Sequence, residues 1–110
     1  MKNYSEMFKS LGDENRLRIF LMLAERPMCV CEINAILNIA LSTISAHLKN
    51  LKYARLIEDS KEGRWVVYKL ANNPFAYDLL NILKSYLKEN NTFSSDIEKV
   101  KRINRDNLVC

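Results

Sequence analysis

Apolar residues recur at every third or fourth position through the first half of the chain, which is the spacing of amphipathic helices. The pattern predicts helices over 4–11, 14–25, about 31–38 and about 41–54. Gly12 separates the first two, and Asp13 is placed to cap the second. The last of the four has one apolar side and one side of small, hydrogen-bonding and basic residues, so only one of its faces is expected to pack against a core.

The pattern changes after Ala54. Residues 56–60 and 64–71 are rich in β-branched and aromatic side chains, with Gly63 between them. This arrangement predicts two short strands joined by a turn.

A longer helix is expected next. Asn73 is a favourable cap, and Pro74 suits the first helical position. The apolar stripe over 75–88 is wider than one core contact requires, which indicates a subunit interface.

The order of these elements is typical of a winged helix-turn-helix, a mainly α fold with a small β-hairpin. The helix at 41–54 would lie in the DNA major groove, and the hairpin would be the wing. We place the DNA-binding and dimerisation domain at 1–90, with dimer contacts through the terminal helices. Residues 91–110 are expected to form a C-terminal loop, a short helix that begins with the capping pattern Ser95-x-x-Glu98, and a tail.

Composition narrows the class of protein. The 110 residues fit one domain, with 48% apolar and 27% charged side chains. No apolar run approaches the roughly 20 residues that a membrane span needs, and the N-terminus lacks the apolar segment of a signal peptide. We expect a cytoplasmic protein without membrane contact and with reduced thiols, in which Cys29 and Cys31 are not a structural disulfide.

Positive charge is concentrated in one segment. The chain has 17 Lys and Arg residues against 13 Asp and Glu, a net charge of +4. Between His47 and Lys69 there are six basic and three acidic residues, so this segment alone carries +3. A basic segment suits a nucleic-acid surface, although a solvated charged face has the same composition.

Two of the three cysteines, Cys29 and Cys31, are one residue apart. Such a pair can be two buried small side chains, a redox pair or half of a metal site. Side chains two positions apart on a regular helix point about 200° away from each other, so both thiols could hold one ion only from the N-terminal end of a helix. That position also favours thiolate over thiol, and thiolates select soft acceptors such as As(III), Sb(III), Cd(II), Pb(II), Cu(I) or Zn(II).

Four stretches together resemble one family. They are L-G-D-E-N-R-L-R-I-F at 11–20, C-V-C-E-I at 29–33, L-S-T-I-S-A-H-L-K-N-L at 41–51 and E-G-R-W-V-V-Y-K-L at 62–70. Over about residues 8–71 the chain resembles the ArsR-type repressors, a family of arsenical- and metal-sensing winged-helix proteins. The resemblance implies a homodimer that binds an inverted-repeat operator in double-stranded DNA and releases it when an inducer binds. In relatives with Cys-Val-Cys at this position, these thiolates bind soft metals or metalloids.

The chain also departs from the family pattern. Asn34 stands where some arsenite-sensing relatives have a third cysteine, and Leu41 and Ala46 replace polar residues of the reading helix. Arg55 replaces the glycine that often ends that helix. The family's other metal site needs histidines on the helix at 75–88, which has none.

The metal prediction names Cys29 and Cys31 as ligands of a soft metalloid or metal, with arsenite as the first choice and no organic cofactor. As(III) takes three sulfurs, so Cys110 is a candidate third ligand from its own subunit or its partner's, unless it belongs to a frayed terminus. A thiol redox or sulfur-responsive repressor that uses Cys110 is an alternative, as are a Cd-, Pb- or Zn-type sensor and a metal buffer without DNA function.

The DNA prediction rests on polar and basic side chains of the reading helix and the wing. The candidate contacts are Ser42, Thr43, Ser45, His47, Lys49, Lys52, Lys61 and Arg64. The first three suit base edges or phosphates, and the basic residues suit phosphates, while solvated surface is the alternative for each. His47 lies at the border of the apolar face, where a histidine more often satisfies a hydrogen bond. No enzyme signature appears, since the chain has two glycines and one histidine and lacks a phosphate-binding loop.

Overall fold

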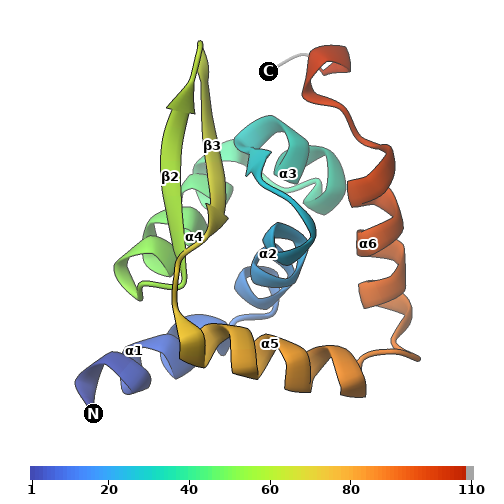
Figure 1. Cartoon of the computed structure of the whole chain (residues 1–110). Coiled ribbons are helices and arrows are strands. Elements are labelled where there is room, and N and C mark those ends of the chain that lie inside the picture. The colour runs from blue at the N-terminus through green and yellow to red at the C-terminus, as the bar shows by residue number, and fades with distance from the viewer. Residues whose placement is uncertain (109–110) are drawn as a thin grey trace.

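The computed structural model describes residues 1–108 and confirms a mainly helical chain with a small antiparallel sheet (Figure 1). The elements are α1 (Lys2–Leu11), α2 (Glu14–Glu25), β1 (Met28–Cys29), α3 (Val30–Leu37), α4 (Leu41–Tyr53), β2 (Ile57–Glu62), β3 (Trp65–Leu70), α5 (Pro74–Tyr86), α6 (Asn91–Arg102) and a 3-10 turn at Arg105–Asn107.

Helix α2 lies at the centre of the fold. Its residues 19–23 are all buried, because α1, α4, the sheet and α6 pack around it. The β2–β3 hairpin and α4 lie to one side of α2 and α6 to the other, while α1 and α5 run along the end opposite the hairpin tip (Figure 1). The two ends of the molecule therefore present different surfaces.

Local sequence signals account for several helix starts. The Asp13 carboxylate accepts a hydrogen bond from the Arg16 N–H at 3.0 Å and begins α2 as predicted. Asn73 accepts one from the Ala76 N–H at 3.2 Å, with Pro74 at the first position of α5.

The sheet has one strand more than the two predicted. Its order is β1-β3-β2, with Met28 opposite Tyr68 and Cys29 opposite Val67. The predicted hairpin is confirmed, and Gly63 turns the chain with a φ of +59°. Two residues are too few to leave a periodic pattern, so β1 was not predicted.

The loop predicted at the start of the segment 91–110 is wrong, since α6 begins at Asn91. The Asn90 side chain accepts a hydrogen bond from the Phe93 N–H at 2.9 Å, and α6 begins directly after it. Ser95 and Glu98 therefore lie inside the helix, where Glu98 pairs with Arg102 instead of forming a cap.

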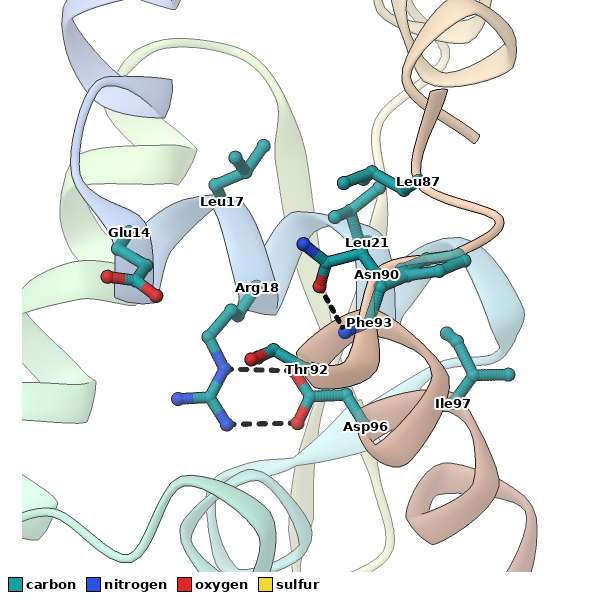
Figure 2. Close-up of a pocket in the computed structure, with 10 residues that line it drawn as sticks. All are labelled: Glu14, Leu17, Arg18, Leu21, Leu87, Asn90, Thr92, Phe93, Asp96 and Ile97. Atoms are coloured by element: carbon teal, nitrogen blue, oxygen red, sulfur yellow. Dashed lines mark hydrogen bonds and ion pairs between the residues drawn. The ribbon is translucent and has the colours of Figure 1, made fainter. Parts of the chain in front are cut away.

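Helix α6 is held against α2 by a partly buried ion pair. Arg18 donates two hydrogen bonds to the Asp96 carboxylate, at 2.8 and 2.9 Å (Figure 2). The carboxylate raises the pKa of the Arg18 guanidinium through these hydrogen bonds. Beside the pair is a cavity of about 130 Å³, whose lining includes Leu17, Leu21 and Phe93.

Arg55 follows the C-terminal end of α4 and stands where the resemblance implies a glycine. The Leu56 N–H bonds the Leu51 carbonyl, and the Arg55 N–H bonds the Lys52 carbonyl, which together make a Schellman motif. Arg55 itself adopts the left-handed conformation, with a φ of +64°. A residue with a Cβ is strained there, so the cap is formed at a conformational cost.

Within residues 1–108, no single helix is long and apolar enough to cross a bilayer. Helices α3 and α4 meet the length and composition requirement only when joined, and they are bent by 114° at their junction.

Candidate thiol and nucleic-acid sites

Cys29 lies where a strand becomes a helix. It is the last residue of β1 and the N-cap of α3, with an extended backbone at φ −90° and ψ 168°. Cys31 is the second residue of the helix. The two cysteines therefore sit at the helix start, which is the arrangement under which one ion could contact both.

Glu32 organises this helix start. Its carboxylate accepts a hydrogen bond from the Cys29 N–H at 3.0 Å, and the Cys29 side chain accepts one from the Glu32 N–H. The pattern is a capping box with a cysteine in place of the usual serine or threonine. The three-residue spacing between Cys29 and Glu32 was the sequence signal for this contact, and sequence reasoning missed it.

The Cys29 thiol is less acidic than its position suggested. The side chain is buried, and burial raises the pKa of the Cys29 thiol, to which the nearby Glu32 carboxylate adds. The backbone hydrogen bond from Glu32 lowers this pKa but does not compensate. The expectation that the helix start favours thiolate at Cys29 is therefore wrong, because desolvation outweighs the backbone hydrogen bonds at the helix start.

Among the described residues Cys29 is a free thiol and Cys31 is disulfide-bonded, so these residues offer no complete set of free ligands. Cys31 is buried like Cys29, with 6% of its surface exposed. Within residues 1–108, no group of three or more His, Cys, Asp and Glu side chains is arranged to hold a metal ion. The third predicted ligand, Cys110, lies outside the described residues.

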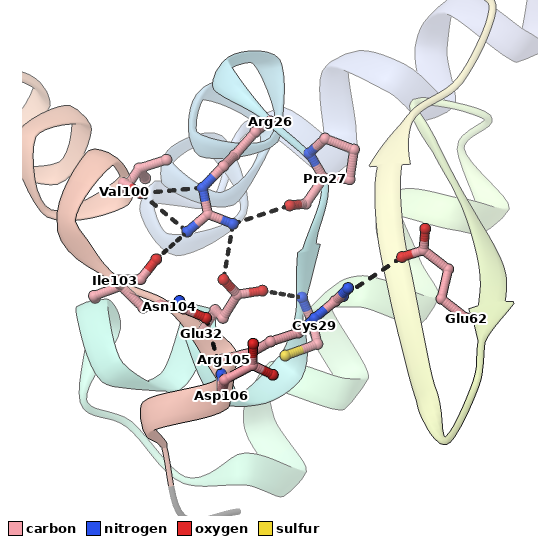
Figure 3. A network of polar contacts seen from close by, with 10 residues as sticks. All are labelled: Arg26, Pro27, Cys29, Glu32, Glu62, Val100, Ile103, Asn104, Arg105 and Asp106. Carbon is pink, nitrogen blue, oxygen red and sulfur yellow. Dashed lines mark hydrogen bonds and ion pairs between the residues drawn. The ribbon is translucent and has the colours of Figure 1, made fainter.

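Arg26 connects this site to the C-terminal end of α6. It bonds the Glu32 carboxylate at 2.7 Å and the Pro27 carbonyl at 3.2 Å. It also bonds the Val100 carbonyl at 3.1 and 3.0 Å and the Ile103 carbonyl at 2.6 Å. Figure 3 shows the guanidinium between these carbonyls and the carboxylate. The sequence pattern did not reveal this network, because its members are up to 77 residues apart.

Asn34, where the resemblance implies a third cysteine in some relatives, makes a structural contact. Its side-chain amide donates a hydrogen bond to the Ile39 carbonyl at 2.6 Å. Ile39 lies in the short turn between α3 and α4. Asn34 thus fixes the turn of the helix-turn-helix.

The exposed face of α4 presents most of the predicted DNA contacts. Ser42, Thr43, Ser45 and Lys49 are exposed, and Lys52 is also exposed but forms an ion pair with Asp59 at 3.0 Å. His47 is different, since its side chain is only 14% exposed. Its ring nitrogens lie 3.4 Å from the Arg16 guanidinium and 3.9 Å from the Asp13 carboxylate.

The wing places basic side chains around the only tryptophan. Lys61 and Arg64 are exposed at the hairpin tip. The Arg64 guanidinium lies 5.0 Å from the centre of the Trp65 ring, and that of Arg105 lies 5.9 Å from it. The C-terminal part of the chain therefore contacts the wing.

Large apolar side chains are exposed along α1 and α5. Tyr4 and Phe8 of α1 pack edge-on against Phe75, yet remain 47% and 57% exposed. On α5, Ile82 and Tyr86 are 56% and 85% exposed. These exposed residues, the apolar surface of the chain, belong to the two helices that run along the end opposite the hairpin tip (Figure 1).

Comparison with known proteins identifies the family. Residues 13–59 match the model of the bacterial regulatory protein, arsR family. The arsenical resistance operon repressor of Bacillus subtilis is 38% identical over 71 residues, which are 64% of this chain and 68% of that protein. The cadmium resistance transcriptional regulatory protein CadC of Listeria innocua is 41% identical over 69 residues, 62% of this chain and 58% of that protein.

Comparison with solved structures supports the same family. A homodimeric winged helix-turn-helix DNA-binding domain, Mb0332 of Mycobacterium bovis, has a TM-score of 0.70 and 27% identity, and the match covers 82% of each chain. The chain spans only about half the length of several other curated relatives that it matches, 51% in one case and 52% in another. From the match in sequence and in fold, the chain belongs to the ArsR family of bacterial regulatory proteins.

Proposed function

We propose that the protein is a dimeric transcriptional repressor that releases its operator when Cys29 and Cys31 bind a soft metalloid or metal. The observation that carries the proposal is the position of the two cysteines in the first turn of α3. This helix and α4 form the helix-turn-helix, so a change at the thiols acts directly on the element that would read DNA. The family membership supports the DNA-binding part, and the names of the relatives support the metal part.

The DNA surface is proposed from exposure and charge. Two copies of α4 would enter successive major grooves about 34 Å apart on an inverted repeat. Ser42, Thr43 and Ser45 would face the bases or phosphates at the start of α4. Lys49, Lys61 and Arg64 would contact phosphates and give binding its salt dependence. His47 and Lys52 are weaker candidates, since both already have partners within the chain.

The dimer is proposed to form through α1 and α5, where the exposed aromatic and aliphatic residues lie. This places the apolar surface between two copies and leaves both hairpin tips free. The division of the chain at residue 90 and a cytoplasmic location remain predictions that accompany this function.

Inducer binding would require the start of α3 to open. Cys29 has an extended backbone while Cys31 is helical, so one ion can hold both sulfurs only after the first turn adjusts. Opening breaks the Cys29–Glu32 capping box. An inducer can shift the protein toward such a shape only by its differential affinity for the two shapes.

The inducer class follows from the donor atoms. When both are reduced, the two cysteines select soft acceptors. Arsenite is the first choice because several relatives are named as regulators of arsenic or arsenical resistance. A three-sulfur arsenite site would need Cys110 in addition, from the same subunit or its partner. If cadmium, lead or zinc is the inducer, the bound ion differs and the proposed repressor function stays the same.

The test follows metal binding and DNA release in one sample. Reduced protein on a fluorescent operator is titrated with As(III), then Cd(II) and Zn(II), while thiolate–metal absorption is recorded. We expect the wild type to release DNA, the variant Cys29→Ser/Cys31→Ser to bind DNA and not release it, and Cys110→Ser to show whether the third thiol is needed. Release from the double variant would overturn the thiol assignment.

A thiol redox or sulfur-responsive repressor is the second candidate. It would work without a metal, through a reversible disulfide or polysulfide that uses Cys110, since a disulfide between Cys29 and Cys31 would be strained. Mass spectrometry after mild oxidation distinguishes this candidate from the metal sensor. A new disulfide or polysulfide that weakens operator binding would favour the redox or sulfur-responsive repressor. A protein without operator affinity at moderate salt would instead support a metal buffer.

A further inference from the structure

We infer that the Arg26–Glu32 ion pair couples the thiol site to the wing through the C-terminal segment, residues 103–108. This inference rests on the proposed function, since it concerns how the thiol site would act on the DNA-binding surface. It assigns Glu32 and Arg26 as positioning residues and Arg105 as the contact that reaches the wing.

The first step is the connection between Cys29 and Glu32. Glu32 is buried, with 2% of its surface exposed. One oxygen of its carboxylate accepts a hydrogen bond from the Cys29 N–H, and the other accepts one from Arg26. A movement of the Cys29 backbone toward a bound ion removes the first of these hydrogen bonds. The carboxylate would then be free to change its position relative to Arg26.

The second step is the hold of Arg26 on α6. Its guanidinium makes five hydrogen bonds, one from Nε and two from each terminal nitrogen, which is the full donor capacity of arginine. Because the donors form a rigid fork, the guanidinium cannot follow Glu32 and keep all its bonds to Val100 and Ile103. Displacing Glu32 therefore loosens the point where the C-terminal segment leaves α6.

The third step is the contact of that segment with the wing. Arg105 lies 3.4 Å from the Glu62 carboxylate and 5.9 Å from the centre of the Trp65 ring. Both contacts are partly exposed and weak by themselves, so the hydrogen bonds of Arg26 to Val100 and Ile103 are the stronger polar hold on the segment. The three steps form one continuous path from Cys29 to the hairpin that carries Lys61 and Arg64 (Figure 3).

Glu32→Gln tests the anchor without metal or DNA. The amide keeps the size of the side chain and removes the charge that faces Arg26. We expect amide hydrogen exchange in residues 103–108 to become about tenfold faster, as for the loss of a charge-assisted hydrogen bond. Trp65 is the only tryptophan, and its emission should move toward that of Arg105→Ala, which lacks the contact.

Glu98→Gln is the matched control, because it makes the same chemical change in an exposed ion pair on α6. This variant should leave both the exchange rates and the Trp65 emission as in the wild type. If Glu32→Gln behaves like Glu98→Gln, the coupling is overturned.

The reciprocal measurement uses a substitution at the surface, so it stands even where Glu32→Gln does not fold. Coupling between two sites acts in both directions. Because Arg105→Ala releases the C-terminal segment from the wing, this variant should therefore expose Cys29 more often. We expect alkylation of Cys29, located by mass spectrometry in the reduced protein, to become about twofold faster, since a weak contact can transmit no more than its own free energy. Lys101→Ala, an exposed neighbour on α6, is the control. Equal alkylation rates in the two variants would overturn the coupling.

These measurements separate the inference from the proposed function. Neither requires an inducer, so an inducer that fails to release DNA removes the proposed function alone. Linked changes at Trp65 and Cys29 would support the coupling in that case too.

Discussion

Cys29 ends a strand and caps a helix, and both roles keep its thiol out of water. The pKa of this thiol is raised by burial, so at neutral pH Cys29 is protonated. A metal ion that binds Cys29 must displace this proton, whereas a metalloid hydroxide such as As(OH)3 takes the thiol hydrogens away as water. The two inducer classes should therefore differ in their response to pH.

We predict that Cd(II) affinity rises by about tenfold per pH unit for each thiol that is protonated, up to the raised pKa of Cys29. As(III) affinity should stay nearly constant over the same range, because no net proton is released. The Cd(II) affinity is measured by titration against a competing chelator at pH 6, 7 and 8, with a correction for the protonation of the chelator. The As(III) affinity is measured at the same pH values by direct thiolate absorption. A Cd(II) affinity that does not change with pH would show that Cys29 is not a ligand.

Arg55 offers a second test at a single residue. It holds a left-handed conformation that a residue with a Cβ adopts at a cost of about 1–2 kcal/mol. Arg55→Gly removes that strain, and the greater freedom of glycine in the unfolded chain offsets part of the gain.

We expect the free energy of unfolding to rise by about 0.5–1 kcal/mol, measured by denaturant unfolding with an unchanged slope. Arg55→Ala, which keeps the Cβ, should show no such gain. A destabilised glycine variant would mean that the Arg55 side chain contributes more than its backbone conformation costs.

Among the elements, α6 shows most clearly what the sequence pattern could and could not predict. Helix α2 was predicted with its observed bounds, because an acidic cap, an apolar stripe and a proline mark it. The start of α6 was missed, because its first turn is polar and reads as a loop. Its position depends on Arg18 and Asp96, which are 78 residues apart in the chain. The extended start of α3 was inferred from the cysteine spacing, but the burial of Cys29 depends on packing that no local pattern encodes.

The Arg18–Asp96 pair should make a large contribution to the docking of α6. Asp96→Asn would leave Arg18, whose side chain is 25% exposed, without its charged partner. We expect the free energy of unfolding to fall by about 2 kcal/mol. This is less than the loss expected for a fully buried ion pair, because the Arg18 side chain reaches solvent. Glu98→Gln should cost less than about 0.5 kcal/mol. Similar losses in both variants would show that α6 docks through its apolar face alone.

At the scale of the whole molecule, the two ends have different chemistry. One end carries the hairpin tip with its basic side chains, and the other carries the exposed apolar residues of α1 and α5. A dimer formed through the apolar end would leave both wings and both α4 helices on its remaining surface. Affinity for an inverted repeat would then depend on residues far from the DNA.

Ile82→Glu tests this dependence. A carboxylate at this position, 56% exposed in the monomer, would have to be desolvated in the dimer, so we expect association to weaken by at least about a hundredfold. Sedimentation should show a monomer, and the preference for an operator with two half-sites over one with a single half-site should be lost. Val66→Glu makes the same kind of change at an exposed position on β3 and should remain dimeric. A dimeric Ile82→Glu protein would place the interface elsewhere, because a face that tolerates an unpaired carboxylate is not buried between subunits.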